Sequence, residues 1–174
     1  MHNFPLPIGG TMNTVSQKGS APNFYLKDIN GNQFSLNQQL GKVVVIHFMA
    51  VGCGGQIYSV NEQQLRQLGT ICGRYCGEKP FAMVTVAVAT CENSKLEQIR
   101  TNHNIDWIFG NDYDDKEIDI VHAYVDAYSI KDETILLIDK TLNVVRVYTE
   151  VVTADALSIK INQLLETQHL RNAS

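Results

Sequence analysis

Four cysteines carry the chemical potential of this chain, namely Cys53, Cys72, Cys76 and Cys91. A cysteine acts as a nucleophile or a metal ligand in its thiolate form, so the surroundings of each thiol decide its role. Four cysteines among 174 residues are too few for a disulfide-based scaffold. Redox chemistry, metal binding and simple packing therefore all remain open for these residues.

Cys53 has the setting that most favours reactivity. It follows a short, β-branched apolar run, Val43–Met49, which is typical of a strand buried on both faces. From Gln56 onward, apolar residues recur three and four apart and predict a helix. A thiol between the two would lie at a helix N-terminus, where partial positive charge favours the thiolate. The turn itself is rich in glycine, with Gly52, Gly54 and Gly55 around the cysteine.

Cys91 is the candidate resolving cysteine. It comes just after a second predicted strand, Phe81–Ala89, as Cys53 comes after the first. The carboxyl ends of parallel strands meet at one edge of an open sheet, where function gathers. We therefore expect Cys53 and Cys91 to approach within disulfide reach, which requires Cα atoms within about 7 Å, or to share a metal.

Cys72 and Cys76 lie four residues apart, on one face of the predicted helix from Gln56 to Tyr75. Such a pair can hold a metal, although two thiolates need further ligands to complete a tetrahedral site. The simpler prediction is that both are partly buried packing residues at the helix end.

Two further polar residues fall within apolar runs. His47 lies in the first strand and is expected to be a hydrogen-bonded core residue. Thr134 opens a later predicted strand, Thr134–Asp139, and Glu133 directly precedes it. If Glu133 lies beside Cys53, its negative charge raises the thiol pKa, or its carboxylate accepts a proton or completes a metal site.

The remaining periodicities place these residues in an α/β domain. Asn30-Gly31 between two alternating runs predicts an N-terminal hairpin in which both turn residues take positive φ. Ser94 is expected to begin a short helix, because Ser94 and Glu97 have capping-box spacing. A second helix is expected over Glu117–Val125, with Ile118, Val121 and Val125 facing the core. Val144–Val152 is expected to form a fourth strand. The strand–helix–strand order predicts a central mixed sheet with helices on both faces. We expect a flexible leader over residues 1–20, one domain over 21–168 and a tail over 169–174.

Composition excludes some functions. The net charge of −4 gives no support to nucleic-acid binding. No apolar run approaches the roughly 20 residues of a membrane span, so a soluble protein is expected. The first 20 residues lack the pattern of a signal peptide. The chain is expected to be cytoplasmic if it is complete and exported if a signal was removed.

Three stretches resemble the thioredoxin-like superfamily, specifically the group of TlpA-like thiol–disulfide proteins, AhpC/TSA-type peroxiredoxins, glutathione peroxidases and Sco copper proteins. The resemblance covers about residues 22–165 and implies a three-layer α/β/α sandwich. The stretches are Ala21–Leu36, Gly41–Cys53 and Thr134–Asp139.

The departures from this family fall on the working residues. Gln56 stands where the family's Cys-x-x-Cys motif has its second cysteine, and Ile57 where a Sco protein has one. Ala50 replaces the threonine that peroxiredoxins carry three residues before the reactive cysteine. Glu133 occupies the place of the thioredoxin cis-proline. The resemblance therefore implies a degenerate motif.

Two functions follow. The first is a thiol-dependent oxidoreductase, without a cofactor, in which Cys53 attacks a protein disulfide or a small peroxide, the latter as an antioxidant activity. Cys91 or an external thiol would then resolve the intermediate. The second is a non-catalytic thioredoxin-like module that binds a protein, or a Sco-like metal-handling protein with Cys72 and Cys76 as possible ligands.

Overall fold

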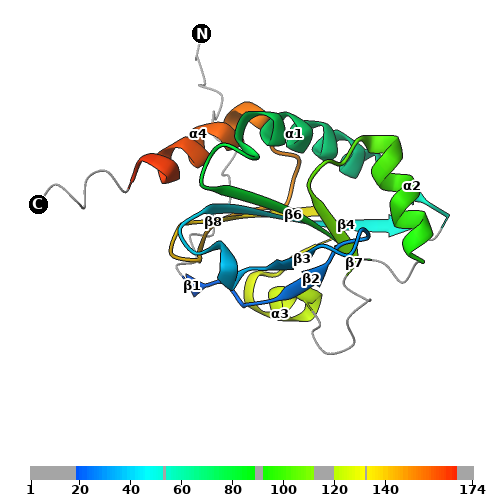
Figure 1. Cartoon of the computed structure of the whole chain (residues 1–174), viewed down its shortest axis with the longest axis horizontal. Coiled ribbons are helices and arrows are strands. Elements are labelled where there is room, and N and C mark those ends of the chain that lie inside the picture. The colour runs from blue at the N-terminus through cyan, green and yellow to red at the C-terminus, as the bar shows by residue number, and fades with distance from the viewer. Residues whose placement is uncertain (1–18, 53, 89–91, 112–119, 132, 168–174) are drawn as a thin grey trace, which may run out of the picture.

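A computed structural model describes residues 19–52, 54–88, 92–111, 120–131 and 133–167. These residues form three layers (Figure 1). A central sheet carries three helices on one side, and a fourth helix together with a two-stranded hairpin on the other. The three-layer α/β/α sandwich predicted from the sequence is confirmed.

The elements have the following bounds. The strands are β1 (Gly19–Ser20), β2 (Tyr25–Lys27), β3 (Gln33–Ser35), β4 (Val43–Gly52), β5 (Gln56–Ile57), β6 (Phe81–Val88), β7 (Ile108–Asn111), β8 (Glu133–Ile138) and β9 (Asn143–Tyr148). The helices are α1 (Ser59–Tyr75), α2 (Asn93–His103), α3 (Ile120–Tyr128) and α4 (Ala154–Glu166), with a short 3-10 turn at Asn37–Gln39.

The sheet is mixed, with the order β1-β9-β8-β4-β6-β7, and β5 pairs back onto β4. Strands β4, β6 and β7 are parallel, because helical crossovers connect them, while β8 and β9 are joined by a tight turn and run antiparallel. This topology confirms the parallel and antiparallel pairs expected from the order of the elements. Among the described helices, none has the length and apolar character needed to cross a bilayer.

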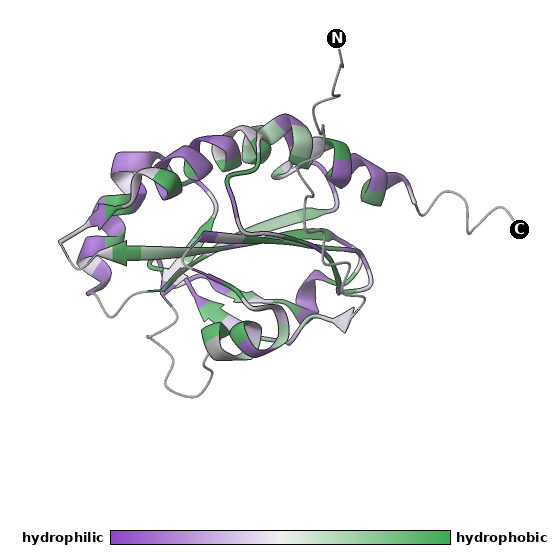
Figure 2. Cartoon of the chain, turned by 180° about the vertical axis from the view of Figure 1, so that it is seen from behind, coloured by the Kyte–Doolittle hydropathy of each residue, from purple (hydrophilic) through white to green (hydrophobic). Residues whose placement is uncertain are grey.

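Strand β4 lies at the centre and is buried on both faces. Its side chains alternate between the two layers. Val43, Val45 and Met49 pack toward α1, α2 and α4. Val44, Ile46 and Phe48 pack toward α3 and the hairpin. In Figure 2 the central strands carry mainly hydrophobic residues, whereas the helices carry both hydrophobic and hydrophilic ones.

The N-terminal hairpin forms as predicted, but with a longer connection. Lys27 pairs with Gln33, and the carboxylate of Asp28 accepts hydrogen bonds from the backbone N–H groups of Asn30 and Asn32, at 2.9 and 2.6 Å. Only Gly31 takes positive φ, at 85°. The expectation of positive φ at both turn residues is therefore wrong, because the aspartate holds a wider turn.

Several boundaries differ from the sequence prediction. Helix α1 begins at Ser59 rather than Gln56, because Gln56 and Ile57 pair with β4 first. Helix α2 begins at Asn93 after Glu92, and no side chain caps it, so the capping box at Ser94 is wrong. Strand β9 ends at Tyr148, four residues earlier than expected.

The inward face of α3 also differs from the prediction. Ile120, Tyr124 and Tyr128 are buried, whereas Val125 is 38% exposed. Ile118 lies outside the described residues. The helix turns its tyrosines inward because their hydroxyls have partners: Tyr124 donates to Pro22 O at 2.7 Å and Tyr128 to Ser20 O at 3.1 Å.

Burial raises the pKa of Tyr124 far above its ordinary value, and the neighbouring Tyr128 adds to the shift. Since the buried phenol resists ionisation while the unfolded chain ionises near pH 10, the folded state loses stability as pH rises above about 10.

We predict that Tyr124→Phe lowers the free energy of unfolding by about 1 kcal/mol at pH 7, because the Pro22 carbonyl loses its donor. The variant should also lose less stability between about pH 9 and 11 than the parent. Urea unfolding at about pH 7, 9 and 11 checks both expectations. Tyr25→Phe, at an exposed tyrosine, is the control. Equal effects of the two substitutions would contradict the prediction.

Candidate functional site

The carboxyl end of β4 is shaped by a glycine-rich hairpin. Gly52 pairs with Gln56, and the Gly55 N–H donates to Gly52 O at 3.0 Å. Gly55 has φ of 78°, and a Cβ there would come within 2.9 Å of Gln98 Oε1 on α2. The positive φ is what requires glycine at this position, because the flexible end of Gln98 could move aside for a Cβ. The predicted site residues Gly52, Gly54, Gly55 and Gln56 thus belong to one tight hairpin that packs against α2.

Cys53 and Cys91 lie outside the described residues, so their proximity stays a prediction. What the structure describes is the elements that lead to them. Gly52 ends β4, and Val88 ends β6, its parallel neighbour; Ala50 pairs with Val88. Both strands therefore end at the same edge of the sheet, as the sequence predicted.

The helix-based argument for a reactive thiol is weakened by the extra strand. Helix α1 starts at Ser59, six positions after Cys53, with the hairpin between. The field of a helix terminus falls off within about the first turn. The described hairpin replaces the short strand-to-helix turn predicted from the sequence, and the N-terminus of α1 therefore no longer supports a reactive Cys53.

A buried polar group anchors the start of α1 to β4. Asn61 is fully buried, and its side-chain amide donates to Ala50 O at 2.6 Å. Its Oδ1 has no partner among the described residues. Gln64, one turn later, both donates to Val152 O and accepts from Val152 N, at 3.2 and 2.8 Å. Sequence reasoning missed both residues, because polar side chains on a helix usually indicate a solvated face.

His47 and Glu133 form a buried pair close to this edge of the sheet. Glu133 opens β8 and pairs with Met49 of β4. His47 Nε2 lies 2.8 Å from Glu133 Oε1, and the two residues are 0% and 7% exposed. This geometry confirms that His47 is a hydrogen-bonded core residue. The second oxygen, Glu133 Oε2, is buried without a partner among the described residues.

The pair continues into a chain of hydrogen bonds across the sheet. Trp107 Nε1 donates to Thr85 Oγ1 at 2.8 Å, and Thr85 Oγ1 lies 3.2 Å from His47 Nδ1. Since an indole N–H only donates, the Thr85 hydroxyl hydrogen is free for Nδ1, which leaves Nε2–H to donate to Glu133. No pattern in the sequence indicates that Thr85 and Trp107 belong to this network.

Thr134 has a structural role next to Glu133. Its hydroxyl accepts from Lys131 N at 2.9 Å and donates to Lys131 O at 3.3 Å, and so closes the turn that precedes β8. The side chain is fully buried. Thr134 therefore fixes the backbone from which Glu133 projects.

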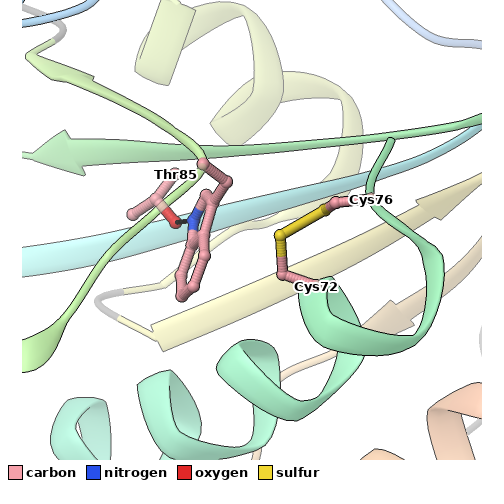
Figure 3. The surroundings of a disulfide bond; sticks show 4 residues. Cys72, Cys76 and Thr85 are labelled. Atoms are coloured by element: carbon pink, nitrogen blue, oxygen red, sulfur yellow. Dashed lines mark hydrogen bonds between the residues drawn. A yellow bond between two sulfur atoms is a disulfide. The ribbon is translucent and has the colours of Figure 1, made fainter. Parts of the chain in front are cut away.

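Cys72 and Cys76 are joined by a disulfide at the end of α1, with Cα atoms 4.8 Å apart (Figure 3). The metal-ligand prediction for this pair is therefore wrong for this state, since neither sulfur is a free thiolate. Among the described residues, no group of three His, Cys, Asp or Glu side chains could hold a metal. The spacing of four on one helical face was the available signal. The same spacing also suits a metal pair or two packing residues, so it does not by itself predict a disulfide.

The disulfide lies at the opposite end of the sheet from Gly52. The chain leaves α1 at Tyr75 and enters β6 at Phe81, which pairs with Val43, the first residue of β4. Strand β4 has 10 residues, which at about 3.3 Å each gives a length of roughly 30 Å. Helix α1 begins near the Gly52 end of β4 and ends toward the start of that strand, so Cys72 and Cys76, at the end of the helix, lie away from Gly52.

We predict that Thr85→Val lowers the free energy of unfolding by about 2 kcal/mol, because it leaves the Trp107 N–H and the His47 ring nitrogen buried and unpaired. Chemical denaturation checks this. Thr70→Val, at an exposed position on α1, is the matched control. A loss no greater than that of the control would show that the network is satisfied in another way.

No family model and no curated protein matches the chain. Solved structures do match. The thioredoxin domain of a thiol–disulfide oxidoreductase from Bacteroides vulgatus is 21% identical, with a TM-score of 0.67 over 85% of this chain and 96% of that one.

Two other bacterial structures agree with this match. A DsbF homologue from Corynebacterium diphtheriae has a TM-score of 0.70 at 16% identity, over 94% of this chain and 100% of that one. A thiol:disulfide interchange protein from a Bacteroides species has a TM-score of 0.67 at 20% identity, over 88% and 95%. At such identities the similarity concerns the fold. The chain has the thioredoxin-like fold.

Proposed function

We propose that this protein is a thiol–disulfide oxidoreductase with Cys53 as its nucleophile. One observation carries the proposal. The described residues on either side of Cys53 in the sequence, Gly52 and Gly54 to Gln56, belong to a tight hairpin at the carboxyl end of the central strand. The buried Glu133 opens β8, the strand that pairs with β4 next to this end. Two of the solved structures named above are described as a thiol–disulfide oxidoreductase and a thiol:disulfide interchange protein, which supports the same class of reaction.

The proposed reaction is a pair of exchanges. The Cys53 thiolate attacks one sulfur of a target disulfide, the target's S–S bond breaks, and the departing thiolate takes a proton. A second thiol then attacks the Cys53 sulfur of the mixed disulfide and releases the reduced target. Cys91 is the proposed source of this thiol, supported by the parallel pairing of β4 and β6 up to Ala50 and Val88. An external thiol is the alternative.

Glu133 is the proposed proton acceptor for Cys53. Its Oε1 is held by His47 at 2.8 Å, while Oε2 retains its capacity to accept. A carboxylate near a thiolate also disfavours the negative charge on sulfur. Proton acceptance by Glu133 would speed the attack of Cys53, whereas the negative charge of the carboxylate would slow it. Because the two effects change the rate in opposite directions, a substitution of Glu133 distinguishes them.

Reduction of a small peroxide is a narrower form of the same proposal, in which Cys53 is oxidised to a sulfenic acid. Ala50 favours disulfide exchange over peroxide reduction, since the resemblance implies a threonine there in peroxiredoxins. A non-catalytic binding module is favoured by one observation. Gln56, at the place of the second motif cysteine, lies exposed on β5.

We predict that Cys53→Ser abolishes reduction of a model protein disulfide by dithiothreitol, because the attacking sulfur is lost. Ser94→Ala, at an exposed position on α2, should leave turnover unchanged. Hydrogen peroxide is assayed in parallel to separate the two substrates. A parent protein without turnover toward either substrate would establish the binding module instead.

We predict that Glu133→Gln slows the first exchange by about 10²-fold or more, because the thiol loses its proton acceptor. A stopped-flow pH profile of Cys53 alkylation and disulfide attack checks this, with thermal unfolding as a test of folding. Glu62→Gln, near the surface on α1, is the control. A faster reaction in Glu133→Gln would show that the carboxylate acts only through its charge.

A further inference from the structure

We propose that the Cys72–Cys76 disulfide is a second redox site, which is reduced by a small peptide thiol bound in the adjoining cavity. The inference rests on the position of the disulfide and not on the reactivity of Cys53. Cys76 is exposed at the end of α1, and Cys72 is half-buried against the α1 side of the core. A thiolate can therefore reach Cys76 from solvent.

The disulfide contributes little to holding the fold together. It closes a loop of only four sequence positions within a single helical turn. The entropy that a disulfide removes from the unfolded chain is smallest for such short loops. The turn is also closed by the backbone, since the Cys76 N–H donates to Cys72 O at 2.8 Å. Exposed disulfides with little structural role are the labile ones.

A cavity of about 390 Å³ adjoins the two cysteines. This volume lies within the range of about 300–1,000 Å³ that is usual for small-molecule sites. Its lining is partly polar, with Asn32, Gln33 and Arg100, and partly apolar, with Met83 and Trp107. The cavity thus offers a small polar molecule both hydrogen-bonding groups and apolar contact beside a disulfide.

The cavity also contains an open sheet edge. Strand β7 pairs with β6 only from Val84 onward. Ala82 and Met83 line the cavity and pair with β4 alone among the described strands. An extended peptide can add its backbone hydrogen bonds to such an edge. We therefore assign the ligand as a short peptide thiol, and glutathione is the probe.

The reaction balances without a further reactant. A glutathione thiolate attacks Cys76 Sγ, the Cys72–Cys76 bond breaks, and Cys72 takes the electron pair and a proton. A second glutathione thiolate attacks the glutathione sulfur of the mixed disulfide, and Cys76 leaves with the electron pair and a proton. The protein gains two electrons, and two thiols become one glutathione disulfide.

The test uses the full-length Cys53→Ser/Cys91→Ser variant, in which only Cys72 and Cys76 remain. It is equilibrated with glutathione at stepped ratios of reduced to oxidised form and then alkylated. Trypsin with a glutamyl endopeptidase separates the two cysteines into peptides 67–74 and 75–78. Their alkylation is read by mass spectrometry, and folding is followed by circular dichroism.

We expect both peptides to shift from oxidised to alkylated as the ratio rises, while circular dichroism stays unchanged. Fluorescence of Trp107, the single tryptophan and part of the cavity wall, should change in parallel. A pair that stays joined at every ratio, or that opens only with loss of structure, overturns the proposal. Reduction by a protein dithiol but not by glutathione overturns the assignment of the ligand.

Two further comparisons locate the chemistry. In the same background and with oxidised glutathione, whose S–S bond breaks and releases one reduced glutathione, Cys72→Ser should form a mixed disulfide at Cys76 at least about fivefold faster than Cys76→Ser forms one at Cys72, because access governs the exchange. Gln33→Phe narrows the cavity. It should slow reduction of the Cys72–Cys76 disulfide by glutathione about tenfold, but slow its reduction by the smaller 2-mercaptoethanol less than about twofold. Gln63→Phe, on the exposed surface of α1, is the control. Equal rates in either comparison contradict the cavity-bound reaction.

Discussion

The architecture depends on one strand that is paired on both sides and covered on both faces. β4 bonds to β6 and β8 along most of its length, and its first seven residues are buried. A strand with no solvent-facing side must be apolar throughout, which is why Val43–Met49 reads as a continuous run. The helices and the hairpin pack against the two rows of side chains that β4 and its neighbours present.

The side chain of His47 interrupts this apolar run. It belongs to a hydrogen-bond network whose other members come from three different segments of the chain. His47 contacts Glu133 of β8 and Thr85 of β6, and Trp107 contacts Thr85 from the segment before β7. Burying these groups without partners would cost several kcal/mol in total. Because each hydrogen bond requires one alignment of the strands, the network disfavours shifted registers of β4, β6 and β8.

The sequence predicted the parts of the fold that repeat with a regular period. The buried strands, the parallel β4–β6 pair and the core face of α4 at Leu157 and Ile161 follow from patterning alone. What it missed depends on contacts between distant residues. Gln56 and Ile57 leave the helical pattern because β4 extends far enough to pair with them. Val125 turns outward because Tyr124 and Tyr128 have hydroxyl partners in the N-terminal segment.

The candidate sites show the same limit. Glycines and a cysteine after an apolar strand were visible in the sequence, and so was the spacing of Cys72 and Cys76. The chemistry of each place, however, is set by groups brought in from elsewhere. At the glycine-rich end of β4 these groups are His47 and Glu133. Beside the Cys72–Cys76 disulfide they are the residues that line the cavity, including Trp107. No local pattern encodes such encounters.

The N-terminal hairpin has a consequence for association between molecules. It lies against the last strand of the sheet: Asp28 bridges to Gly110, and the Ile29 N–H donates to Phe109 O at 3.2 Å. A Cβ at Gly110 would come within 2.8 Å of Lys27 O, so the approach is close. The hairpin thereby covers part of the edge of β7, through which two copies of the chain could otherwise associate by edge-to-edge strand pairing. Removing the β2–β3 hairpin would expose both an aggregation-prone sheet edge and some of the core side chains that the hairpin covers.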